Sequence, residues 1–111
     1  MVRTIKQSNR TTIIDSRYVT LRSDNAYVAQ IDKDKGTLIL SPFWHYNSTT
    51  WQHVRKFIKD YKEEFSETAQ MWMHNMFNSK NGRAYMQMLV DNYIIPVESD
   101  WTLYYRMADE D

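Results

Sequence analysis

Residues 47–61 carry the feature that most restricts the fold, because they form a strongly patterned helix directly after a hairpin signal. Thr49 and Gln52 have the spacing of a capping box, in which the hydroxyl accepts from a backbone N–H and the amide side chain reaches back. Apolar residues then recur at helical intervals and form one stripe, made of Trp51, Val54, Phe57, Ile58 and Tyr61. This pattern predicts a helix over about 49–64 with its stripe facing a core.

The residues before this helix are typical of β-strands. Runs 18–22 and 27–31 alternate between polar and apolar residues, and 37–40 is a short β-rich run. The link between the last two runs is short and polar and ends in Gly36, which adopts positive φ easily, so these runs should form a hairpin. Residues 11–14 predict a further strand. The strands are therefore expected mostly within about 11–41.

The residues after the first helix predict two more helices. Ser66 is the expected N-cap of a helix over 66–78, and a breaker cluster then precedes a shorter helix over 82–92. Residues 97–111 form a C-terminal extension, either a strand or a docked segment. The expected fold is a single α+β domain over 1–111, with a small antiparallel sheet packed against two to three helices. The side chains predicted to face its core are Trp51, Phe57, Ile58, Trp72, Met76 and Leu89.

Composition limits the class of protein. A chain of 111 residues with 42% hydrophobic and 25% charged residues suits one globular domain. The absence of cysteine excludes disulfides, thiolate nucleophiles and cysteine-based zinc sites. No stretch approaches the roughly 20 apolar residues of a membrane span, and the N-terminal residues lack the apolar run of a secretory signal. A cytoplasmic location with no membrane partner is therefore expected.

No pattern of a catalytic or metal site is present. The spacing of His45, His53 and His74 matches no zinc signature, and His53 is expected either to flank the apolar stripe or to bond to a partner there. Residues 32–36 resemble the start of a calcium loop, but the twelfth position of that loop is Phe43 instead of an acid. With two glycines in the chain, a phosphate-binding loop is nearly excluded. We expect no cofactor, no metal and no catalytic residue, and hence a protein that is not an enzyme.

Charge is distributed unevenly although the net charge is zero. Residues 1–62 hold 11 Lys and Arg against 5 Asp and Glu, and residues 63–111 hold 3 against 9, so the halves carry +6 and −6. A basic patch can contact phosphate, but the equal acidic surplus opposes strong nonspecific binding to nucleic acid. The acidic half could instead dock on a basic surface of another protein.

Aromatic residues suggest a protein-binding surface. Four Trp, eight Tyr and four Phe exceed what a small core needs, and such residues are enriched where proteins meet. The expected partner-binding residues are Trp44, Tyr46, Glu98, Asp100, Trp101, Tyr104, Tyr105, Asp109, Glu110 and Asp111. The alternative is a small nucleic-acid-binding regulatory protein that uses the polar side of the first helix, through Arg55, Lys56, Lys59 and Lys62.

The chain also resembles known sequences over residues 18–61. The similarity is carried by the hairpin, by Ser41-Pro42 and by a motif made of Tyr46, Asn47, Ser48, Thr50, His53, Val54 and Phe57. This pattern is similar to one in small uncharacterised proteins of bacteriophages and other mobile elements of Gram-positive bacteria. The resemblance transfers no functional residue. It implies a phage protein that binds and inhibits a host defence protein, such as a CRISPR effector, in the manner of an anti-CRISPR protein.

Overall fold

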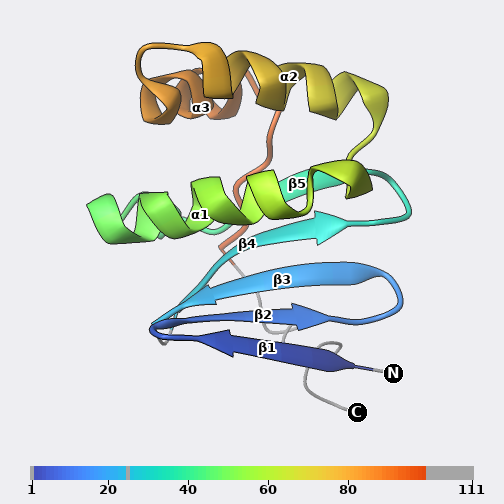
Figure 1. Cartoon of the computed structure of the whole chain (residues 1–111). Helices are drawn as coiled ribbons and strands as arrows, with labels where there is room; N and C mark the ends of the chain where they lie inside the picture. Colours follow the sequence, from blue (N-terminus) through green and yellow to red (C-terminus); the bar gives the residue numbers. More distant parts are fainter. Residues whose placement is uncertain (1, 25, 100–111) are drawn as a thin grey trace.

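The computed structural model of the protein describes residues 2–24 and 26–99, which form an antiparallel sheet packed against helices (Figure 1). The sheet has five strands: β1 (Arg3–Gln7), β2 (Arg10–Ile14), β3 (Tyr18–Ser23), β4 (Ala26–Asp32) and β5 (Thr37–Leu40). Each strand pairs with the next one along the chain. The predicted α+β class and the predicted hairpin of β4 and β5 are confirmed.

The helices form two layers beside the sheet. They are α1 (Ser48–Asp60), the short 3₁₀ helix η1 (Lys62–Glu64), α2 (Glu67–Asn78) and α3 (Gly82–Asp91). Helix α1 packs against β3 and β4, and α2 and α3 lie side by side beyond α1 (Figure 1). In the described part of the chain, none of the helices combines the length and the apolar content needed to cross a membrane.

The N-cap of the first helix lies two residues before the predicted one. Asn47 is the N-cap, and its side-chain oxygen accepts from the backbone N–H and the hydroxyl of Thr50 at 2.8 and 3.0 Å. The predicted capping box of Thr49 and Gln52 is therefore wrong, because both residues lie inside the helix. Helix α1 also ends at Asp60, and the 3₁₀ turn that follows accounts for the rest of the predicted range.

The strand β1 was not expected, because the sequence predicts the sheet from about residue 11. Its five residues include one apolar side chain, Ile5, so they lack the alternation that marks a strand. As an edge strand, β1 is mostly exposed and pairs on one side with β2, where Ile5 faces Thr12. The turn between β1 and β2 contains Ser8 at φ 52°.

The main core lies between the sheet and the helices. Four of the six side chains predicted to face it are at most 2% exposed: Phe57, Ile58, Met76 and Leu89. Trp51 and Trp72 are half-buried and pack against the same cluster. A smaller cluster, formed by Ile13 and Tyr27, lies on the opposite face of the sheet, because side chains alternate along a strand.

The hairpin between β4 and β5 also fixes the start of α2. Gly36 has φ +67° and its carbonyl accepts from the backbone N–H of Ser66 at 3.0 Å. A Cβ at Gly36 would collide with the Ser66 backbone, so glycine is required by both conformation and space. Ser66 is the N-cap of α2, as predicted, and its hydroxyl accepts from the N–H of Ala69 at 3.2 Å.

The last described residues return to the sheet. Val97 forms a parallel bridge with Leu40 at the end of β5, and the N–H of Glu98 donates to the Leu40 carbonyl at 2.8 Å. The predicted C-terminal extension begins here. Its residues 100–111 lie outside the described residues.

Candidate binding surfaces

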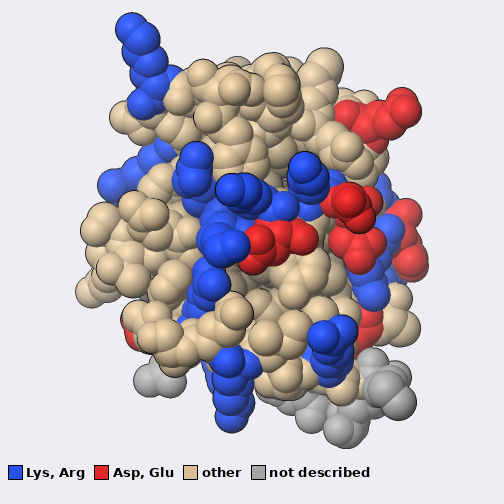
Figure 2. All heavy atoms as spheres, in the orientation of Figure 1, with Lys and Arg blue, Asp and Glu red and all other residues tan. Residues whose placement is uncertain are grey.

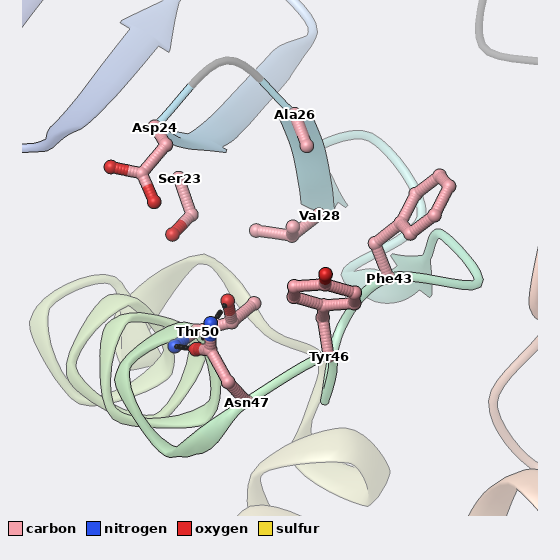
Figure 3. Close-up of a pocket in the computed structure, with 8 residues that line it drawn as sticks. All are labelled: Ser23, Asp24, Ala26, Val28, Phe43, Tyr46, Asn47 and Thr50. Carbon is pink, nitrogen blue, oxygen red and sulfur yellow. Dashed lines mark hydrogen bonds between the residues drawn. The ribbon is translucent and has the colours of Figure 1, made fainter.

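A hollow of about 440 Å³ lies where the β3–β4 turn meets the start of α1 (Figure 3). The residues that line it are Ser23, Asp24, Ala26, Val28, Phe43, Tyr46, Asn47 and Thr50. In Figure 3 the rings of Phe43 and Tyr46 stand on one side, while Ser23 and Asp24 lie across from them. These two rings are 54% and 77% exposed, so they are available to a ligand or a partner.

Two polar residues of the segment 46–57, Asn47 and His53, stabilise the start of α1 next to this hollow. Asn47 caps α1 and holds Thr50, and His53 Nδ1 lies 2.7 Å from the hydroxyl of Ser23 at the end of β3. Of the two expectations for His53, the structure therefore shows the partner-bonded one. The hydrogen bond between His53 and Ser23 therefore joins α1 to β3, while Tyr46 remains exposed.

The environment of His53 favours its neutral form. Burial lowers the pKa of His53, and the positive charge of Arg10 lowers it further, while the negative charge of Asp24 acts in the opposite direction. A neutral imidazole can share the hydrogen bond with Ser23 in either tautomer. His53 does not itself line the hollow, but its hydrogen bond holds Ser23, which does.

Trp44 does not belong to the exposed surface that the sequence predicts. Its side chain is 1% exposed, its ring stacks on His45 at 4.1 Å between centroids, and Trp51 meets it edge-on at 5.7 Å. Trp44 is therefore a core residue that anchors the segment before α1.

The neighbouring His45 favours its neutral form, because burial, and to a smaller extent the positive charge of Arg83, lowers its pKa.

The other predicted partner-binding residues are spread along the chain. Tyr46 lines the hollow, and Glu98 is exposed beside β5. The remaining members of that set, Asp100, Trp101, Tyr104, Tyr105, Asp109, Glu110 and Asp111, lie outside the described residues. Phe43 was not in the predicted set, although its position beside Trp44 and Tyr46 in the sequence was a usable signal.

A second hollow, of about 470 Å³, lies between α1 and α2, and we call it the basic groove. It is lined by Arg55, Lys59, Lys62, Gln70, Met73, His74 and Phe77. Figure 2 shows Lys and Arg side chains gathered over α1 on this face, with a few acidic side chains among them. Three of the four predicted nucleic-acid-binding residues thus line one groove.

The fourth predicted basic residue differs from these three. Lys56 does not line the basic groove, and its ammonium nitrogen lies 2.9 Å from a carboxylate oxygen of Asp60. Within residues 2–24 and 26–99, no carboxylate lies within 4.0 Å of the cationic groups of Arg55, Lys59 or Lys62. The groove residues from α2, namely Gln70, Met73, His74 and Phe77, were not predicted as a site, because the groove exists only where α2 lies beside α1.

The calcium-like segment is a structural turn. Asp32 accepts from the backbone N–H groups of Asp34 and Lys35, and Arg17 contacts the Asp32 carboxylate at 3.0 Å and that of Asp34 at 3.7 Å. Burial raises the pKa of Asp32, but the hydrogen bonds from Arg17 and from these backbone groups outweigh it, so the net pKa is lowered. Among the described residues, no group of three or more His, Asp and Glu side chains could hold a metal ion.

The two hollows offer different groups to a ligand. The hollow at the start of α1 offers two aromatic rings beside hydroxyl and carboxylate groups, and the basic groove offers three cations beside apolar side chains. Comparisons of the chain with protein-family models, with curated proteins and with solved structures found no match.

Proposed function

We propose that the protein is a non-enzymatic inhibitor that a phage or mobile element supplies and that binds a host defence protein, as an anti-CRISPR protein does. This context is suggested by the sequence pattern of residues 18–61, which resembles one in small phage and mobile-element proteins. The protein acts in the host cytoplasm by occupying a surface of its target.

The observation that supports the proposal is the pair of exposed aromatic rings at the hollow beside α1. Exposed Tyr residues at a concave surface are typical centres of protein interfaces, where a few aromatic side chains carry most of the binding energy. Tyr46 is held by a fixed scaffold, because Asn47 caps the helix immediately after it. A partner side chain that enters the hollow would bury Tyr46 and Phe43 together.

The test is capture of a partner from a lysate of bacteria with active defence systems, with a nuclease-treated duplicate and mass spectrometry of the bound material. The wild-type protein should retain one stoichiometric defence protein after nuclease treatment. Tyr46→Ala should weaken its binding by about 30-fold or more, the effect of losing about 2 kcal/mol at an aromatic anchor.

The matched control is Tyr93→Ala. Tyr93 is 94% exposed and follows α3, and it does not line the hollow. Tyr93→Ala should leave the captured protein and its affinity unchanged. Equal capture by wild type and Tyr46→Ala would remove this hollow as the interface, and loss of the captured protein with nuclease would contradict direct binding.

The acidic C-terminal half supplies a second test of the same proposal. If it contacts a basic channel of the target, neutralising its acids should weaken binding and reduce the salt dependence. The residues to neutralise are Glu98, Asp100, Asp109, Glu110 and Asp111. Unchanged affinity in this variant would remove the electrostatic part of the proposal and leave the aromatic part standing.

A further inference from the structure

We propose that the basic groove between α1 and α2 binds single-stranded nucleic acid, with phosphates at Arg55, Lys59 and Lys62 and a base against the apolar side chains of α2. This site is separate from the first hollow, which lies between the β3–β4 turn and the start of α1. The two share no lining residue, so each can be tested without the other.

The arrangement of the cations is the first support. Arg55 and Lys59 are one helical turn apart, about 6 Å along the axis of α1, and Lys62 extends the row into η1. Because no described carboxylate neutralises them, their charge is available to a ligand. A row of unpaired cations along a groove matches the repeating charge of a phosphate backbone.

The apolar side of the groove is the second support. The guanidinium carbon of Arg55 lies 4.9 Å from the centre of the Phe77 ring, which holds this cation in the groove. Met73 also lines the groove but is 3% exposed, so the flat surface that the groove offers a base is the half-buried Phe77 ring with the Arg55 guanidinium over it. Aromatic rings and Arg guanidinium groups are the surfaces on which proteins stack unpaired bases.

These two features together favour an unpaired strand over an acidic protein segment. An acidic peptide would use the cations but would leave the surfaces for stacking unused. A base-paired duplex hides the faces of its bases, so it could use the phosphate contacts alone. A single strand can use both features, because each nucleotide supplies a phosphate for the cations and an unpaired base for the apolar surface.

The experiment is fluorescence anisotropy of the full chain with a labelled oligothymidylate of about 12 nucleotides. Three phosphate contacts should give a slope of about −2 for the logarithm of the association constant against the logarithm of salt concentration. Binding should therefore weaken about 20-fold between about 50 and about 200 mM salt. The double variant Lys59→Gln/Lys62→Gln should bind more weakly and reduce the slope to about −0.7.

Two control variants separate the groove from general charge. Lys35→Gln/Lys80→Gln removes the same charge from exposed residues outside the groove and should leave the slope near −2. Lys56→Gln changes a lysine on α1 that is paired with Asp60 and should have a smaller effect than Lys59→Gln. Equal effects of the groove and control variants would overturn the proposal, as would no binding at about 50 mM salt.

The apolar part of the site has its own variant. Phe77→Leu keeps the residue apolar but removes the ring, so it should weaken binding at least fivefold and leave the salt slope unchanged. Circular dichroism of each variant confirms that it is folded. If polyglutamate binds this groove while the oligonucleotide does not, the site is one for acidic protein and the proposal fails. Because these assays contain no host protein, their outcome is independent of the proposed function.

Discussion

Truncation of Phe57 to alanine should destabilise the protein by about 4 kcal/mol. Phe57 lies on the inner face of α1 and is 2% exposed, and its ring is 5.4 Å from that of Tyr61. Losing the burial of the ring costs about 2 kcal/mol. A cavity of about 100 Å³ costs about 2 kcal/mol more, at about 24 cal/mol per Å³.

The size of this effect can be judged against the whole fold. A chain of this length has a free energy of unfolding of about 6–17 kcal/mol, so the variant should remain folded with its stability much reduced. The melting temperature should fall by about 15 °C, since 1 kcal/mol corresponds to about 4 °C for a domain of this size.

The assay is urea unfolding followed by circular dichroism and tryptophan fluorescence, with Phe43→Ala as the matched control. Phe43 is 54% exposed, so the same substitution there should change the free energy of unfolding by about 1 kcal/mol or less. If Phe57→Ala and Phe43→Ala have equal stability, the placement of α1 against the sheet is wrong. Phe57→Leu provides a milder variant should the alanine variant not fold.

Three further predictions follow from the caps, the half-buried His53 and the hairpin. Asn47→Ala should cost about 0.5–2 kcal/mol of stability in urea unfolding while Thr49→Ala costs less, and the reverse order would restore the capping box as the true helix start. The lowered pKa of His53 means that the unfolded chain binds a proton near pH 6.5 and the folded chain only below it, so the free energy of unfolding should fall from about pH 7 to pH 5. His53→Gln should flatten this part of the profile, and an unchanged profile would contradict the assignment. Gly36→Ala should cost more than about 1 kcal/mol in thermal unfolding, because the new Cβ meets the Ser66 backbone at a positive φ, and a neutral effect would refute that close approach.

The parts of the fold that the sequence predicted are those with local signals. The hairpin at Gly36, the cap at Ser66 and the apolar stripe through Phe57 depend on residues close together in the chain, and all three are found. Asn and Thr are both favourable N-cap residues, so residue type alone could not show whether Asn47 or Thr49 is the N-cap. The extended backbone of Asn47, at φ −150° and ψ 178°, decides the helix start.

The parts that were missed depend on contacts between distant segments. Strand β1 is an edge strand with one apolar residue, so only its pairing with β2 defines it. Trp44 precedes α1 in a segment without periodicity, and its burial requires Trp51 and the core beside it. The basic groove exists only once α2 packs beside α1 and brings Phe77 to Arg55. The pairing of Lys56 with Asp60, at i and i+4, was visible in the sequence and could have separated Lys56 from the other three cations.

The order of the strands also has a consequence for the speed of folding. Because each strand pairs with its neighbour in the chain, every hairpin closes over a few residues and loses little chain entropy. Domains rich in such local contacts fold faster than those with distant pairings. The bridge between Leu40 and Val97 is the opposite case, since it joins the two ends of a long loop that contains all the described helices. We expect the sheet to form early in refolding and this bridge to close only after the helices have packed.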